Sequence, residues 1–162
     1  MTKSRYRLQT VLGVRERAKQ AAARTVAQRR EQVAEAEREL ARREGELARC
    51  RARQREAREA MFGEARTGAE ARRMVEHRTH LADLRAQEET LAASVEEQRA
   101  AVARAERELD VALDALAEAA KEFRVIEKHK ENWRESERVA ARRREQKVSD
   151  EVAALLRRTR DE

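Results

Sequence analysis

Apolar and small residues recur at alternating spacings of three and four along most of this 162-residue chain, in two separate stripes. The first stripe consists of Leu12, Ala22, Val26, Val33, Ala36, Leu40, Leu47, Cys50, Ala57 and Met61. The second consists of Met74, His77, Leu81, Leu84, Leu91, Val95, Val102, Ala105, Leu109, Ala112, Leu116, Ala119, Phe123, Ile126 and Trp133. A sustained period of seven predicts helices that supercoil around a narrow seam, rather than a broad face on a globular core.

The composition agrees with long helices and argues against a compact enzyme domain. Charged residues make up 43% of the chain, aromatic residues 2%, and proline is absent, so a single globular core would have little to bury. Ala, Arg, Glu and Leu dominate, and these residues lose least on entering a helix. We therefore predict an all-α protein.

The stretch MFGEARTGAEARRM separates the two stripes and has the residues of a turn. Gly63 can adopt the positive φ that ends a helix, and Thr67 with Glu70 three residues later resembles a capping box. The sequence thus predicts one hairpin over residues 1–162, a long two-helix antiparallel coiled coil. Its expected parts are a first helix at about 4–62, a turn at about 63–67 and a second helix at about 68–159.

Folding the chain about residue 64 brings both stripes into one antiparallel register. The expected neighbours are Leu47 with Leu81, Val33 with Val95, Val26 with Val102, and Leu12 with Leu116. Arginines on or beside the first stripe should bend their stems around small neighbours; they are Arg15, Arg29 and Arg43.

The second helix is longer and should overhang the first from about Val125. That leaves Trp133 without a residue of the first helix to cover it. The overhang keeps an amphipathic spacing at its end, where Val148, Val152 and Leu155 recur. An unpaired apolar strip of this kind predicts a protein partner.

No motif in the chain indicates catalysis or cofactor binding. It has no glycine-rich phosphate loop, no Cys-x-x-Cys and no serine spaced with a histidine and an acid. His77 and His80 could share a metal, but we interpret His77 as a seam residue opposite Cys50 and His80 as a solvated flank. Cys50 is interpreted as a small seam hydrophobe, and a lone cysteine favours a reducing cytoplasm. We expect no enzyme activity, cofactor or metal.

Basic residues gather at two places. The first thirty residues contain nine Lys and Arg against Glu16 alone, while the whole chain carries +6. A second basic run follows in the second helix, at Arg138, Arg142, Arg143, Arg144 and Lys147. Such clusters could follow phosphates, but aromatic residues for base stacking are almost absent, so we do not expect nucleic acid as a partner. No apolar stretch is long enough to cross a bilayer.

Three segments resemble the flagellar export protein FliJ family, which is related to the YscO-like stalk proteins. The start YRLQTVLGVRERAKQAA resembles the opening of that family, and FRVIEKHKENWRESERVAARRREQKVSDEV resembles its closing segment. The glycine-led GEARTGAEARRMVEHRTHLADL is similar to its link into the second helix. The resemblance covers nearly the whole chain.

The resemblance implies a two-helix stalk that enters the ring of a hexameric export ATPase and reaches the membrane-embedded export gate, with export chaperones as further partners. It implies a cytoplasmic protein held at the inner membrane through the export apparatus, either flagellar or of the virulence type. The residues expected at the ring end are Arg5, Tyr6, Arg7, Leu8, Arg15, Trp133, Arg138, Arg142, Arg143, Arg144 and Lys147. Those expected at the hairpin tip are Met61, Phe62, Gly63, Gly68 and Met74. The alternatives are a nucleic-acid-binding basic coiled coil and a structural or adaptor coiled coil.

Overall fold

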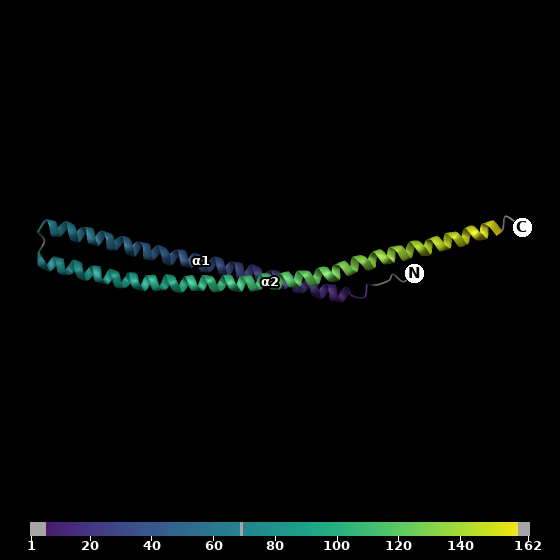
Figure 1. The fold of residues 1–162 in the computed structure, drawn as a ribbon, viewed down its shortest axis with the longest axis horizontal. Coiled ribbons are helices and arrows are strands. Elements are labelled where there is room, and N and C mark those ends of the chain that lie inside the picture. Colours follow the sequence, from purple (N-terminus) through teal and green to yellow (C-terminus); the bar gives the residue numbers. More distant parts are fainter. Residues whose placement is uncertain (1–5, 69, 159–162) are drawn as a thin grey trace. The chain divides into compact units, whose positions relative to one another are not determined.

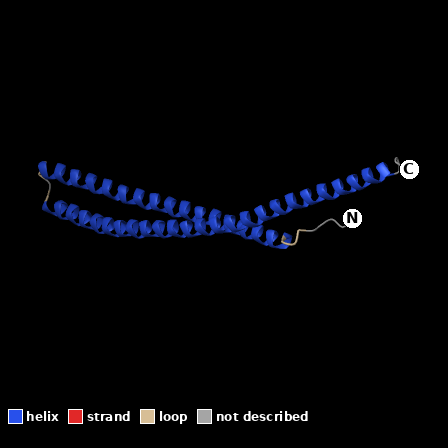
Figure 2. Ribbon diagram, turned by 45° about the vertical axis from the view of Figure 1, so that its right-hand side comes forward, coloured by secondary structure: helices blue, strands red, loops and turns tan. Residues whose placement is uncertain are grey.

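Two long helices make up almost all of the computed structural model, which describes residues 6–68 and 70–158 (Figure 1). Helix α1 spans Gln9–Arg66 and helix α2 spans Ala71–Arg158. No strand occurs in these described ranges, as Figure 2 shows. With 58 and 88 residues, the helices extend roughly 87 Å and 132 Å at 1.5 Å per residue. The predicted all-α, two-helix fold is confirmed.

The chain divides into two compact units, each containing part of both helices. The turn unit comprises residues 25–113, and the terminal unit comprises the described residues up to 24 together with those from 114 onward. In each unit a segment of α1 packs antiparallel against a segment of α2. That all 162 residues form one continuous hairpin stays a prediction.

The turn lies later in the chain than the sequence predicts. Helix α1 continues through Gly63 to Arg66, and the positive φ of 82° belongs to Gly68 instead. Thr67 does not cap α2, because its hydroxyl donates back to the Glu64 carbonyl at 3.0 Å and so closes the last turn of α1. The predicted end of the first helix at residue 62, the turn at 63–67 and the capping box are therefore wrong. The first helix also begins at Gln9 rather than residue 4.

The later turn changes which residues of the two helices are neighbours. Moving a hairpin turn by about five residues moves the opposite residue by about ten, because both arms shift. Cys50 is fully buried with its Sγ 3.5 Å from the Leu84 carbonyl, not opposite His77. His77 instead lies with its Nε2 3.1 Å from the Glu64 carboxylate.

The four expected apolar pairs are wrong for the same reason. Leu47 shares the lining of a groove with Val95, which had been expected beside Val33. Ion pairs show which residues are neighbours in the remaining segments. Arg29 bonds to Glu108, so Val26 does not face Val102. Arg15 bonds to Glu122, so Leu12 does not face Leu116.

The seam of the turn unit is thin and includes polar residues. Its buried apolar side chains are Val26, Leu47, Cys50, Leu81, Leu84, Val95 and Ala112. Gln54 is also buried and donates to the Leu84 carbonyl at 3.0 Å and to Glu88 at 2.8 Å. Gln98 of α2 donates to the carbonyl of Ala36 in α1 at 3.0 Å. A polar seam residue that finds its partner in only one alignment selects that alignment over its neighbours.

Arginines reach across the seam at a regular interval of two heptads. Arg15 bonds to Glu122 in the terminal unit, and Arg29 bonds to Glu108 in the turn unit. Arg43 follows fourteen residues after Arg29 and donates to the side chain and the carbonyl of Ser94, both at 3.0 Å. Their stems thus do more than bend around small neighbours. Each guanidinium bonds to the opposite helix.

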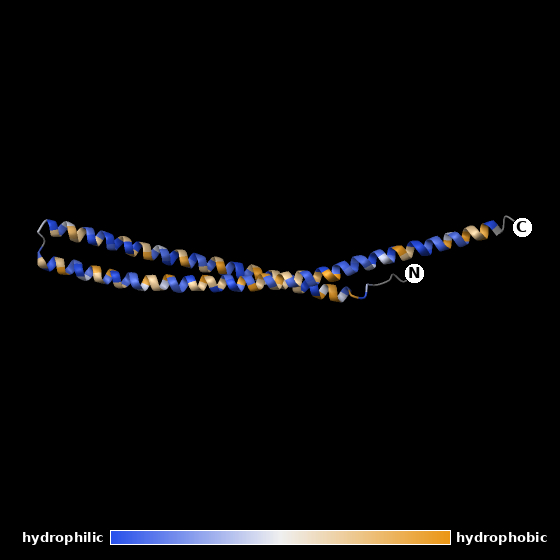
Figure 3. Cartoon of the chain, in the orientation of Figure 1, coloured by the Kyte–Doolittle hydropathy of each residue, from blue (hydrophilic) through white to orange (hydrophobic). Residues whose placement is uncertain are grey.

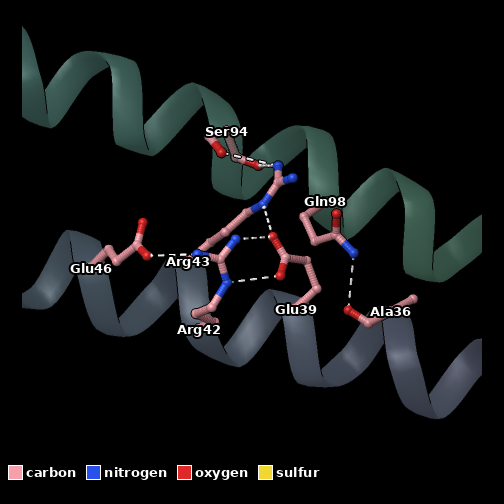
Figure 4. A network of polar contacts seen from close by, with 7 residues as sticks. All are labelled: Ala36, Glu39, Arg42, Arg43, Glu46, Ser94 and Gln98. Carbon is pink, nitrogen blue, oxygen red and sulfur yellow. Dashed lines mark hydrogen bonds and ion pairs between the residues drawn. The ribbon is translucent and has the colours of Figure 1, made fainter.

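Arg43 belongs to a wider polar network, shown in Figure 4. Its Nε lies 2.9 Å from Glu39, and Arg42 lies 2.6 Å from the same carboxylate. Hydrogen bonds from Arg42, the larger cause, and from Arg43 lower the pKa of Glu39 to about 2. Glu39 therefore stays ionised, and stays an acceptor for the seam arginine, at any ordinary pH.

The glycines that flank the turn give a matched pair of substitutions with opposite expected effects. Gly68→Ala should destabilise the chain by about 1–2 kcal/mol, since an L-residue is strained at φ 82°. Gly63→Ala should stabilise it by roughly 0.5–1 kcal/mol, because Gly63 is helical and has space for a Cβ atom. Urea unfolding followed by circular dichroism measures both. If Gly63→Ala were the destabilising change, the turn would lie where the sequence predicts it.

Candidate protein-interaction surface

Tyr6 anchors the start of the described chain against α2. Its side chain is only 6% exposed, and its ring centroid lies 5.3 Å from that of Trp133 and 5.7 Å from that of His129. The Tyr6 hydroxyl lies 3.0 Å from Nδ1 of His129 and donates to the Ile126 carbonyl at 3.4 Å. Aromatic rings at these tilted angles attract each other beyond the area they bury. We call these four residues the Tyr6 clamp.

The Tyr6 clamp corrects the expectation that Trp133 is uncovered. Trp133 is half-buried because Tyr6, although it precedes α1, folds onto it. The overhang therefore begins after Trp133 rather than at about Val125.

The other residues predicted near the N-terminal end differ in exposure. Leu8 is half-buried and Arg7 is exposed, while Arg5 lies outside the described residues. Arg15 is committed to its bond with Glu122. One turn along, Lys19 places its ammonium 4.8 Å from the ring centroid of Phe123, a cation–π contact. This part of the surface is thus largely used for attaching α1 to α2.

Beyond Trp133, α2 continues to Arg158, and no described residue of α1 lies beside it there. Its basic segment comprises the exposed side chains Arg138, Arg142, Arg143, Arg144 and Lys147. Arg138 lies 3.5 Å from Glu135, and Arg144 bonds to the Ala140 carbonyl of its own helix. In the part of the chain that the structure describes, Arg142, Arg143 and Lys147 have no ion pair. Their charges are available to a partner.

Apolar side chains follow the basic segment on the same helix. Val148 is 60% exposed, Val152 50% and Leu155 61%. Figure 3 shows hydrophobic residues interspersed among hydrophilic ones near this end of α2. The predicted amphipathic end is therefore present and lies open. A helix that offers cations and apolar side chains within a few turns is suited to binding another protein.

At the turn, the expected tip residues divide by exposure. Phe62 is 61% exposed, whereas Met61 and Met74 are half-buried. Val75, which the sequence analysis did not single out, is 62% exposed. Two apolar side chains near the turn, Phe62 and Val75, are therefore open to solvent.

Within residues 6–68 and 70–158, no three His, Cys, Asp or Glu side chains are grouped so as to hold a metal ion. His80 is exposed, and His77 faces Glu64. Neither described helix contains a stretch long and apolar enough to span a membrane.

Sequence reasoning missed several residues that hold α1 against α2. Gln54, Glu88 and Gln98 complete the three-and-four spacing of the stripes, so the gaps in the apolar pattern marked them. His129 precedes Trp133 by one helical turn and shares its face, but only the position of Tyr6 shows its role. A hydrogen bond from the Arg51 guanidinium is the main cause that lowers the pKa of Glu88, and a hydrogen bond from Gln54 is the second.

Trp133 is the one tryptophan of the sequence, so its fluorescence reports on the Tyr6 clamp. Tyr6→Ala should shift the emission to longer wavelength and increase quenching by iodide, since the indole loses its cover. Tyr6→Phe keeps the ring and should leave the spectrum nearly unchanged, at a cost of about 0.5–1.5 kcal/mol for the lost hydrogen bonds. Unaltered quenching in Tyr6→Ala would contradict the contact.

Comparison with known proteins relates this arrangement to one family. A family model described as YscO-like protein matches residues 3–161. The solved structure of a YscO homolog from Chlamydia trachomatis superposes with a TM-score of 0.82, at 22% sequence identity, over 98% of each chain. At that identity the superposition supports the fold alone. Among curated proteins, none matches the chain significantly.

The expected relationship to YscO-like stalk proteins is thereby confirmed, and the expected link to the FliJ family is consistent with it. Since the family match extends over nearly the whole sequence, the chain belongs to the YscO-like family, which consists of structural, stalk-type components of type III secretion systems rather than of enzymes.

Proposed function

We propose that this protein is the non-enzymatic central stalk of a type III export apparatus. In this role it enters the ring of the hexameric export ATPase and couples the ring to the membrane-embedded export gate, and it also engages export chaperones. It works on the cytoplasmic side, held peripherally at the inner membrane by the apparatus. The YscO-like relationship favours a virulence-type system over a flagellar one.

The observation that carries this proposal is the unaccompanied end of α2. From Arg134 to Arg158 this helix has no α1 segment beside it in the terminal unit, and it offers the basic segment and then the apolar side chains. A helix that served only to stabilise the hairpin would have no need of this extension. Exposed cations favour encounter with an oppositely charged partner, and apolar side chains then contribute contact area.

We divide the residues expected at the ring end by the contacts that they make. Tyr6 and Trp133 cover each other, and Arg15 is paired with Glu122, so these three position α1 on α2. Within the basic segment, Arg142 and Arg143 have no ion pair with any described residue and Arg144 bonds only to a backbone carbonyl, so we assign the first contact with the ATPase to these three. The turn residues from Met61 to Met74 are proposed to serve a contact other than the ring.

The test combines the full chain with the cognate export ATPase. We expect the wild-type chain to co-purify with the ATPase and to raise its rate of ATP hydrolysis. Replacing Arg142, Arg143 and Arg144 by Glu should weaken binding at least about tenfold, or about 1.4 kcal/mol. A matched control replaces the exposed Arg78, Arg85 and Arg104 by Glu, which changes the net charge equally and should bind almost normally.

Equal losses in the two triple variants would show that net charge alone drives the association. Absence of binding and stimulation by the wild-type chain at every ratio would refute the stalk role. Affinity for duplex DNA that persists near physiological salt would favour the nucleic-acid-binding alternative instead.

A further inference from the structure

A second apolar stripe runs along α1 in the terminal unit, on a different side of the helix from the seam. It consists of Val11, Val14, Ala18 and Ala21, whose spacings of three, four and three match a coiled-coil heptad. At about 100° per residue, these side chains lie within an arc of about 80°. Arg15 and Lys19, which contact α2, are centred roughly 100° from the middle of that arc. We call the four residues the lateral stripe.

The lateral stripe is open to solvent. Val11 is 38% exposed and Val14 is 50% exposed. Ala18 and Ala21 are exposed as well. A single exposed valine would need no explanation, but apolar side chains in heptad spacing form a continuous strip, which a second helix can cover. No charge interrupts this strip, because every Lys, Arg, Asp and Glu of residues 9–24 lies outside its arc.

Arg17 and Arg24 border the edge of the lateral stripe that faces away from the seam. They lie one heptad apart, about 40–60° beyond Ala21. In a coiled coil they would take the flanking positions whose charges select the partner. The Arg17 Nε bonds to the Gly13 carbonyl of its own helix, and within the described residues neither arginine forms an ion pair. Both positive charges are therefore uncompensated.

The opposite edge, which borders the seam, carries little net charge. Arg15 lies about 40° beyond Val11 and is paired with Glu122 of α2. Ala22 follows Arg15 one heptad later and is half-buried. Glu16, the one acid among the first thirty residues, lies on the far side of the helix, about 180° from the middle of the lateral stripe. A helix laid on the stripe would thus meet cations along one edge and no unpaired acid of α1 along either.

These features favour a helix of a partner protein over other ligands. The surface of one helix encloses no cavity, so a small molecule would stay mostly exposed on it. No aromatic residue belongs to the lateral stripe or to its two edges, so nucleic-acid bases would have nothing to stack on. Alanines, in contrast, let a second helix approach to the distance of about 8–10 Å between axes that helix packing requires.

We propose that the lateral stripe binds an acidic α-helix of a partner protein as a short coiled coil. Apolar side chains of that helix pack on Val11, Val14 and Ala18, and carboxylates on its flank bond to Arg17 and Arg24. The contact extends over roughly 15–20 Å of α1. It lies on α1, whereas the proposed ATPase contact lies on the end of α2, and neither depends on the other.

The probe is a fluorescently labelled helical peptide with apolar residues at heptad positions a and d and glutamates at e and g. Its control is a peptide of the same composition in scrambled order. We expect the heptad peptide to bind the full chain at least about tenfold more tightly than the scrambled one in fluorescence anisotropy. Arg17→Glu with Arg24→Glu should abolish this preference. Arg78→Glu with Arg85→Glu, which changes the net charge equally at exposed positions of the turn unit, should leave it within about threefold.

A third variant tests the apolar contact while every charge stays. Val14→Gln with Ala18→Gln makes the lateral stripe polar, and glutamine is a good helix former, so circular dichroism should show unchanged helicity. The variant should lose its preference for the heptad peptide. A retained preference would overturn the proposal, as would equal losses in the two arginine variants or equal binding of the scrambled peptide. Tighter binding of duplex DNA than of the heptad peptide would also overturn it and assign the surface to nucleic acid.

Discussion

The structure depends on how narrow the apolar seam between the two helices is. Two positions in seven form the seam, and many of them are alanine, so apolar burial alone distinguishes poorly between one antiparallel alignment and the next. Polar groups supply the distinction. Gln54 and Gln98 are buried against carbonyls of the opposite helix, and Arg29 and Arg43 bond across the seam. Each half-exposed ion pair contributes at most about 1 kcal/mol, but a shifted alignment would leave the buried amides unsatisfied.

That distinction explains which parts of the fold could be predicted. The heptad spacing and the absence of proline predict two helices and their antiparallel pairing, because these depend on local pattern. The register depends on which glycine has a positive φ, and Gly63 and Gly68 are equally capable of it in the sequence. In the structure Gly68 has the positive φ, α1 continues for another turn to Arg66, and Thr67 closes that turn by bonding back to Glu64. The error of about ten residues in pairing follows from that one choice.

Only part of the candidate surface could likewise be predicted from the sequence. Exposure of the basic segment and of Val148, Val152 and Leu155 follows from helix length and charge. The cover that Tyr6 gives to Trp133 could not be deduced, since Tyr6 precedes α1 and its position depends on tertiary contact. The resulting division is useful for function. In the terminal unit, aromatic and ion-pair contacts hold α1 on α2, while the rest of α2 stays open to partners, as suits a structural component of a secretion system.

The most direct test of this account is a crosslink that reports the register of the turn unit. In a Cys50→Ala background of the full chain, Arg51→Cys is combined either with Glu88→Cys or with His77→Cys, and a short bismaleimide is added at low protein concentration. The Arg51 Nε lies 2.7 Å from a carboxylate oxygen of Glu88. His77 lies eleven residues before Glu88, or roughly 16 Å away along the helix. We expect an intramolecular crosslink for the pair at 51 and 88 and little for the pair at 51 and 77. Efficient crosslinking of the second pair, or mainly intermolecular products from the first, would contradict it.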